Sequence, residues 1–139
     1  MDAFDADALI YAAIPEHELG RRVRALIPDE PVAGTPTRTG SVLLLPELLS
    51  KPMRDGAGDE LDDFLALLSR LELLPADRVT ANVATALAAK YRLQAADATH
   101  LATAVVVGAD RFITNNQKDF PVTITEIDIV YPADLPQPD

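Results

Sequence analysis

The apolar residues of this chain follow two different patterns, and each pattern predicts one kind of element. Between residues 61 and 71, leucine and phenylalanine recur every three or four positions, which places them on one face of an α-helix. At 42–45, apolar residues instead form a short unbroken run, which favours a buried strand. Predicted in this way are helices at 8–14, 16–27, 61–70, 78–91 and 95–107, a further helix opening at Pro46, and strands at 3–5, 41–45, 71–74, 111–114 and 124–130.

The alternation of strands and helices predicts the fold class. Short strands connected through helices form a parallel sheet with helices on both faces. We therefore expect an α/β fold, a three-layer α/β/α arrangement with a central parallel sheet, in a single domain over residues 1–130. Residues 131–139 contain three prolines and are expected to fray or to lie along the surface. Residues 32–40 are expected to form a loop or a weak edge strand, and residues 51–60 a polar connection.

Charge and composition narrow the chemistry. The 139 residues include 12 lysines and arginines against 22 aspartates and glutamates, which gives a formal net charge of −10. Such an acidic surface repels nucleic acid, so the charge taken alone argues against a nucleic-acid-binding protein. Cysteine is absent, which excludes disulfides and thiolate zinc sites. With only His17 and His100 as nitrogen ligands, a bound metal should be a hard cation held by oxygen.

The sequence contains no candidate membrane span. No apolar run approaches the roughly 20 residues needed to cross a bilayer, and the first residues carry aspartates instead of a basic targeting segment. We therefore expect a soluble cytoplasmic protein that does not associate with a membrane.

Polar side chains follow the predicted strands, where parallel sheets bind their ligands. Asp5 closes the first strand, and Glu47 lies in a helical first turn just after the second. Asp97 stands in the first turn of the helix at 95–107. Asn116 and Asp119 follow the strand at 111–114. We expect these side chains to gather at one edge of the sheet.

Each acidic residue also has a purely structural explanation. The helix dipole stabilises acids in a first turn, which would account for Asp97 and for Glu47 after Pro46. Asp5 could be a turn residue, and Asp7 is better explained as a helix N-cap than as a metal ligand. Asp97, however, shares a helix face with apolar residues, and a carboxylate turned toward a core needs a partner or a metal. Carboxylates that converge in one cleft would raise one another's pKa, and Mg²⁺ or Mn²⁺ would relieve that repulsion.

Four stretches of the sequence match the pattern of a known family. They are FDADALIY at 4–11, PELL at 46–49, QAADATHLATA at 94–104 and RFITNNQKDF at 111–120. Together, in this order and spacing, they resemble the PIN domain family of metal-dependent ribonucleases, and the resemblance extends over residues 3–125. It implies a compact α/β domain whose acidic cleft binds Mg²⁺ or Mn²⁺ and cleaves single-stranded RNA. At this size it also implies a VapC-type toxin of a toxin–antitoxin pair.

The resemblance also implies roles for individual residues. The metal ligands would be Asp5, Glu47 and Asp97, with Asn116 at the family's fourth acidic position. Thr114 matches a polar residue near the first aspartate and is expected to hydrogen-bond Asp5 or a metal-bound water. The usual substrates of such toxins are loops of tRNA or rRNA. The toxins usually form homodimers and are silenced by a small antitoxin protein whose C-terminal segment fills the cleft.

Asn116 departs from the family pattern and keeps other interpretations open. The amide removes one negative charge but retains an oxygen donor, which weakens a second metal site. Asp119 is a candidate substitute, unless it serves as a loop cap. The alternative to an active nuclease is therefore a catalytically weakened PIN-like module that binds RNA or protein. A third interpretation makes Asp5 the nucleophile and Asp7 the general acid of a haloacid-dehalogenase-like phosphatase, which the short chain disfavours.

A few basic residues are grouped near these positions, at Arg21, Arg22 and Lys51. They would suit contacts with RNA phosphates beside the cleft, or else form ordinary surface ion pairs such as Glu47–Lys51. His100, three residues after Asp97, is better explained as orienting a neighbouring side chain than as a general acid.

Overall fold

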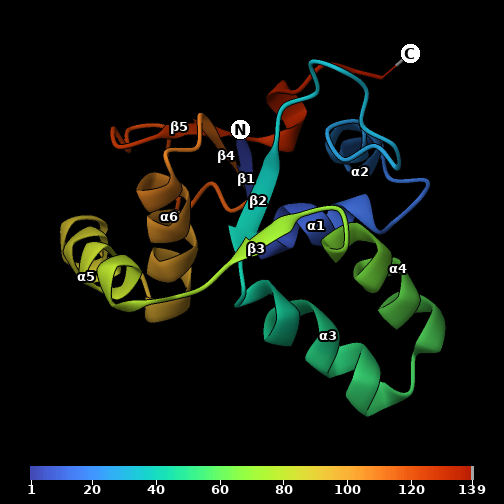
Figure 1. Ribbon diagram of the computed structural model, residues 1–139, viewed down its shortest axis with the longest axis horizontal. Helices are drawn as coiled ribbons and strands as arrows, with labels where there is room; N and C mark the ends of the chain where they lie inside the picture. The colour runs from blue at the N-terminus through green and yellow to red at the C-terminus, as the bar shows by residue number, and fades with distance from the viewer. Residues whose placement is uncertain (139) are drawn as a thin grey trace.

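The computed structural model describes residues 1–138, and in this part of the chain the strands form one parallel sheet (Figure 1). The five strands lie in the order β3-β2-β1-β4-β5, and every neighbouring pair is parallel. They are β1 (Asp2–Phe4), β2 (Arg38–Ser41), β3 (Glu72–Leu74), β4 (Arg111–Ile113) and β5 (Asp128–Val130). The first strand of the chain is thus the centre of the sheet, and the predicted parallel α/β fold is confirmed.

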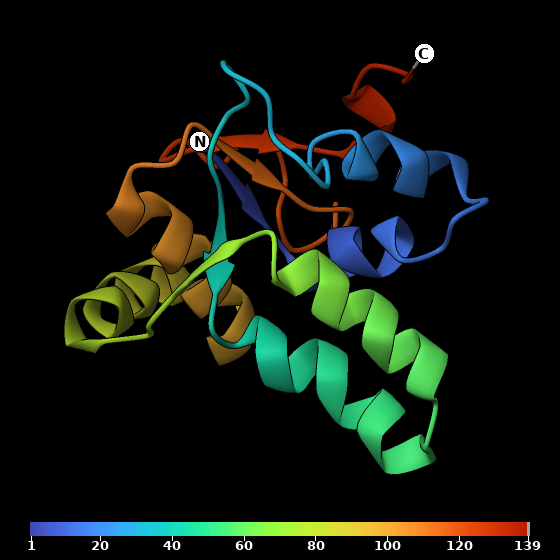
Figure 2. The ribbon, with the colours of Figure 1, turned by 45° about the vertical axis from the view of Figure 1, so that its right-hand side comes forward.

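Helices cover both faces of the sheet, as Figures 1 and 2 show. They are α1 (Ala6–Ala12), α2 (Glu18–Arg24), α3 (Leu44–Asp55), α4 (Gly58–Leu68), α5 (Arg78–Tyr91), α6 (Ala95–Val107) and the short 3₁₀ helix η1 (Pro132–Asp134). Successive strand residues point to opposite faces. Phe4 and Ile113 therefore pack in one core with α1 to α4, whereas Ala3 and Phe112 pack in the other with α5 and α6. This is the expected three-layer arrangement.

The second strand and the helix after it begin earlier than predicted. β2 ends at Ser41 and α3 begins at Leu44, so most of the apolar run predicted as a strand at 41–45 lies outside the strand. A run without a period does not distinguish a strand from a buried helix start. Gly40 allows the tight turn, because a Cβ there would lie only 2.5 Å from Cδ1 of the fully buried Leu44. Pro46 consequently lies inside the first turn of α3 and not at its start.

The prediction of a polar connection at 51–60 is wrong, because α3 continues to Asp55 and α4 begins at Gly58. α3 ends on Gly56, which takes the left-handed conformation (φ 65°) that favours glycine at a helix C-terminus. Most of the polar residues of this stretch lie on exposed faces of the two helices. α3 and α4 form a helical hairpin that projects from the sheet (Figure 2).

Residues 131–138, which follow β5, lie along the surface. Leu135 is buried in the core shared with α1 to α4. The guanidinium of Arg22 donates hydrogen bonds to the carbonyl oxygens of Ala133 (2.7 Å) and Leu135 (3.1 Å). These contacts attach the proline-rich segment to α2.

Two elements are shorter than predicted by more than one residue. α2 covers Glu18–Arg24 of the predicted 16–27, and β5 covers Asp128–Val130 of the predicted 124–130.

Among residues 1–138, no helix is long and apolar enough to cross a membrane.

Candidate active site

Asp5 lies at the carboxyl end of the central strand β1 and is nearly inaccessible, with 4% of its surface exposed. Its backbone N–H donates to the carbonyl oxygen of Ile113 (2.9 Å), which fixes it beside the end of β4. Its carboxylate accepts a hydrogen bond from the N–H of Ala6 (2.9 Å), and Asp5 thereby caps α1. The other carboxylate oxygen accepts one from the hydroxyl of Thr114 (2.8 Å), as predicted.

The environment of Asp5 disfavours the ionised form of its carboxyl group. Burial and, next to it, the charge of Asp7 raise the pKa of Asp5 to about 7. The hydrogen bonds from Thr114 and Ala6 and the influence of His100 oppose this shift without cancelling it. Asp5 is therefore a carboxyl group for which the surrounding protein supplies too little positive charge.

Asp7 was predicted as a helix cap, and this prediction is wrong because Asp5 has that role. The carboxylate of Asp7 accepts a hydrogen bond from the N–H of Asn115 (3.1 Å) and lies 3.3 Å from the hydroxyl oxygen of Thr114. It ties the start of α1 to the segment after β4. The spacing of two residues after Asp5, at the beginning of a helix, was the available signal for this second carboxylate.

Glu47 and His100 meet across the site from α3 and α6. Nε2 of His100 lies 3.0 Å from Oε1 of Glu47, and the histidine is 2% exposed. Burial disfavours the charged imidazole, but the hydrogen bond with Glu47 and the charges of Glu47, Asp5 and Asp97 outweigh it and raise the pKa of His100. Within the described residues Glu47 is thus paired with His100, and the ion pair with Lys51 that we considered is not formed.

Asp97 stands in the first turn of α6, as predicted. Its pKa is raised first by burial and then by the charge of Asp119, with smaller contributions from Glu47 and Asp7, while His100 acts in the opposite direction. These mutual effects place five carboxylates from four parts of the chain at one edge of the sheet. We call this group the acidic cluster: Asp5, Asp7, Glu47, Asp97 and Asp119.

Asn116 holds Asp119 at the edge of the cluster. The side-chain amide of Asn116 donates to Oδ2 of Asp119 (2.9 Å), and its carbonyl oxygen accepts from the N–H of Asp119 (3.2 Å). The N–H of Asn116 in turn donates to the hydroxyl oxygen of Thr114 (3.1 Å). An amide can make both of these contacts with Asp119, whereas a carboxylate could only accept.

The chemistry of the acidic cluster fits a hard divalent cation. All of its ligand atoms are carboxylate oxygens, the ligands that Mg²⁺ and Mn²⁺ prefer. Burial, and after it the neighbouring negative charges, raise the pKa of both Asp5 and Asp97. The side chains do not form a complete coordination site, because no three acidic or histidine side chains in residues 1–138 lie close enough to bind one ion together. Several are instead held by hydrogen-bond partners of their own.

The three predicted phosphate contacts lie in different surroundings. Arg22 is bound to the carboxylate of Glu18 (2.8 Å) and to the carbonyls of the C-terminal segment, so its guanidinium is occupied. Arg21 borders a hollow beside that segment. Lys51 is exposed on α3, one turn after Glu47, and lines the same hollow as Glu47. Of the three, Lys51 is the one that borders a hollow together with a member of the acidic cluster.

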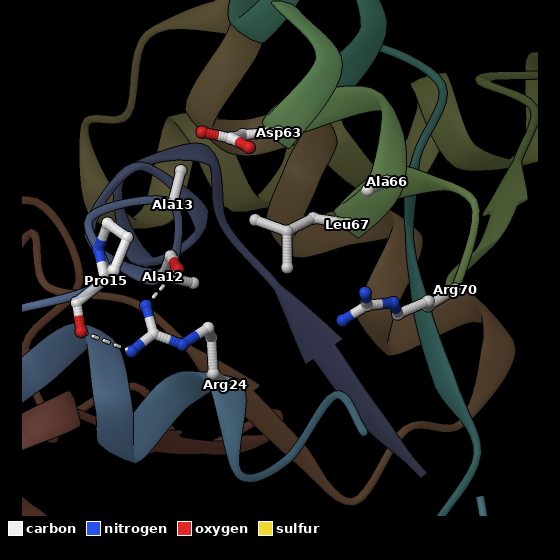
Figure 3. Close-up of a pocket in the computed structure, with 8 residues that line it drawn as sticks. All are labelled: Ala12, Ala13, Pro15, Arg24, Asp63, Ala66, Leu67 and Arg70. Carbon is white, nitrogen blue, oxygen red and sulfur yellow. Dashed lines mark hydrogen bonds between the residues drawn. The ribbon is translucent and has the colours of Figure 1, made fainter. Parts of the chain in front are cut away.

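A groove leads away from Glu47 between α1 and α4. Its first part, about 170 Å³, is lined by Glu47, Lys51, Ile10 and Phe64. A second part of about 340 Å³ shares Ile10 and Phe64 and continues along α1. A third part of about 260 Å³ ends at Arg24, whose guanidinium turns to backbone carbonyls at the end of α1 (Figure 3). The groove is largely apolar, and Ile10 in it is 44% exposed.

The sheet is parallel, and buried and half-buried carboxylates lie at the carboxyl ends of its strands. The chain is therefore an α/β domain with an acidic site. Within that class the chain belongs to the PIN domain family, whose sequence model matches residues 3–123. The matched range includes Asp5 and Asp7, and nothing in the comparisons supports the phosphatase interpretation. No curated protein sequence matches the chain.

Solved structures give the same picture of the fold. The chain is similar to one in a toxin–antitoxin complex from Klebsiella pneumoniae, with 25% sequence identity, a TM-score of 0.73, and coverage of 95% of this chain and 98% of that one. It also resembles chains of the DNA-bound VapBC of Salmonella typhimurium (21% identity, TM-score 0.68, coverage 94% and 97%) and of VapBC2 from Rickettsia felis bound to a fragment of its promoter DNA (18%, 0.74, 94% and 97%). The last two likenesses concern the fold alone.

Proposed function

We propose that this protein is a metal-dependent endoribonuclease that cleaves single-stranded RNA, such as a loop of tRNA or rRNA, and acts as the toxin of a toxin–antitoxin pair. Membership of the PIN family supports a hydrolase that acts on nucleic acid. The likeness to the Klebsiella complex over nearly the whole length of both chains supports the role of a toxin. The observation that carries the proposal is the carboxylate of Asp5, which is buried at the carboxyl end of the central strand and accepts hydrogen bonds from Ala6 and Thr114.

Each residue of the acidic cluster would have its own role in binding the cation. Asp5 and Asp97 would hold Mg²⁺ or Mn²⁺, with Glu47 as a further ligand and Asn116 and Asp119 beside them. The cation, when bound, supplies a water of lowered pKa and neutralises charge on the phosphodiester. Thr114 keeps the Asp5 carboxylate oriented through its hydroxyl. Lys51 is available for a phosphate of the RNA beside Glu47.

The net charge of −10 gives this proposal a direct consequence. The acidic surface repels RNA, so that binding depends on the positive charge that a divalent cation brings to the cluster. RNA should therefore bind weakly in EDTA. The remaining acidity suits a basic segment of a protein partner.

The experiment compares RNA cleavage by the purified protein, free of any antitoxin, in Mn²⁺ and in EDTA. Asp5→Asn and Asp97→Asn should abolish Mn²⁺-dependent cleavage because each removes a ligand charge. Asp128→Asn is the matched control, since Asp128 is an exposed aspartate at the amino end of β5, on the opposite edge of the sheet. Equal background cleavage by all four proteins would reject the nuclease. RNA binding that persists without cleavage would then favour the catalytically weakened binding module.

The proposed antitoxin partner has a candidate binding surface in the groove between α1 and α4. An apolar segment could cover Ile10 and Phe64, and a basic side chain at its end could reach Glu47. The product of a neighbouring gene, co-expressed with this chain, should co-purify with the wild type and not with Ile10→Asp. Val106→Asp is the control, because Val106 is equally exposed but lies on α6.

We also propose that the protein forms a homodimer, as the family resemblance implies. Light scattering on the purified chain measures this directly. A mass of one chain at micromolar concentration would contradict it.

A further inference from the structure

A buried histidine that contacts the acidic cluster has no role in the proposed function. His100 has a side chain that is 1% exposed, and its Nε2 lies 3.0 Å from Oε1 of Glu47. Glu47 belongs to α3, 53 positions earlier in the chain, and its side chain is 34% exposed. Nδ1 of His100 is also buried, and no residue in the described part of the chain gives it a hydrogen-bond partner.

These differences in burial decide which residue positions the other. The imidazole is enclosed by α6 and its neighbours, so packing fixes the plane of its ring. Glu47 has a long, partly exposed side chain that gains rotamer freedom whenever it turns to water. Because an ionised glutamate only accepts hydrogen bonds, Nε2 of His100 is the donor in this contact. The rigid ring therefore holds the mobile carboxylate.

Glu47 needs such a contact because its other charged neighbours repel it. The charges of Glu47 and Asp97 act on each other, and Asp97 carries a raised pKa in part for that reason. The two residues belong to separate helices, and Asp97 lies only three residues before His100 on α6. A donor at His100 thus draws Glu47 toward the helix that carries Asp97, against the repulsion between the two carboxylates.

We infer that His100 is a positioning residue, whose Nε2–H holds the Glu47 carboxylate beside Asp97 so that Glu47 is in place when a divalent cation binds. The inference rests on the proposed function, since the position of Glu47 matters only if the cluster binds an ion. His100 itself touches neither the ion nor the RNA. Residues that orient a metal ligand in this way commonly change metal affinity by 10–100-fold when they are replaced.

The test measures Mn²⁺ affinity by electron paramagnetic resonance of the full chain, alongside cleavage of RNA. His100→Leu fills the space of the ring without a donor and should weaken Mn²⁺ binding by about 10–100-fold. His100→Gln offers an amide N–H near the position of Nε2 and should recover most of that loss. Thr103→Val is the matched control, because Thr103 is a buried polar residue one turn further along α6. Its hydroxyl donates to the backbone carbonyl of Thr99 and to no other side chain or carbonyl within residues 1–138.

A double-mutant cycle separates positioning from simple packing. If His100 acts through Glu47, His100→Leu should change Mn²⁺ affinity by less than about threefold once Glu47→Ala is already present. The same loss in both backgrounds would overturn the inference, and so would unchanged Mn²⁺ affinity in His100→Leu. Should His100→Leu fail to fold, the pair His100→Gln and His100→Asn makes the same comparison, because the shorter amide of asparagine does not reach Glu47. A wild type that binds no Mn²⁺ at all would instead reject the proposed function, and the inference with it.

Discussion

Replacing Asp5 by asparagine should stabilise the protein when no divalent cation is present. The pKa of Asp5 is raised from 3.8 to about 7, first by burial and then by the charge of Asp7. A folded-state pKa above the unfolded value means that folding favours the protonated carboxyl. Its stabilising contribution is therefore complete below about pH 4 and is lost as the pH rises through 7.

The size of this effect follows from the shift. Each pKa unit corresponds to about 1.4 kcal/mol, so ionised Asp5 lowers the free energy of unfolding at pH 8 by at most about 4 kcal/mol. Asparagine carries no charge and still offers an oxygen to the N–H of Ala6, so the cap of α1 survives. The hydroxyl of Thr114 loses its acceptor on Asp5 but lies 3.3 Å from Asp7. A net gain of about 1–3 kcal/mol at pH 8 remains after this loss.

The assay is urea unfolding of the wild type and of Asp5→Asn in EDTA, at intervals between pH 4 and pH 8. The variant should match the wild type near pH 4 and become progressively more stable toward pH 8. Added Mn²⁺ should reverse the order, because only the wild type retains the ligand. A stability difference that does not change with pH would refute the reasoning, and Asp128→Asn serves as the control that should show none.

Three further changes test other parts of the structure. Asn116→Asp removes the hydrogen-bond donor to Asp119 and adds a like charge, so the free energy of unfolding in EDTA should fall by about 1–2 kcal/mol. Added Mn²⁺ should restore part of this loss, and equal stability of variant and wild type in urea would contradict the prediction. Arg22→Ala leaves two carbonyls of the C-terminal segment without their donor and should cost about 2 kcal/mol in the same assay, together with faster proteolysis of that segment. Gly20→Ala should destabilise by at least about 2 kcal/mol, because its Cβ would overlap a backbone carbonyl of α1, whereas Gly58→Ala, with open space around it, should have little effect.

The sequence was sufficient to predict the class of fold and the elements that carry the site. The helices at 78–91 and 95–107 match α5 and α6 in the structure, because their apolar periods are long and their ends are marked by turn residues. The hydrogen bond between Thr114 and Asp5 was predicted from the family resemblance and is present. The order of strands around β1 then explains why residues so distant in the sequence meet.

Other features depended on packing that no local pattern contains. The run at 41–45 has no period, and only the close approach of Leu44 to Gly40 shows that the chain already turns into α3 there. The partnership of His100 with Glu47 joins two helices far apart in the chain, and nothing in either neighbourhood marks it. The role of Asn116 as the residue that holds Asp119 likewise appears only when both contacts are seen together.

The central position of β1 has a consequence for the protein while it is being synthesised. Asp5 is synthesised long before Ile113, to which its backbone bonds, and β4 is in turn bordered by β5, the next strand along the chain. Contacts of such long sequence separation form late, since the intervening chain must first be made and folded. A ribosome that stalls before β4 therefore carries a chain whose acidic cluster is incomplete. Translation past β4 and Asp119 is thus a precondition for assembling the acidic cluster.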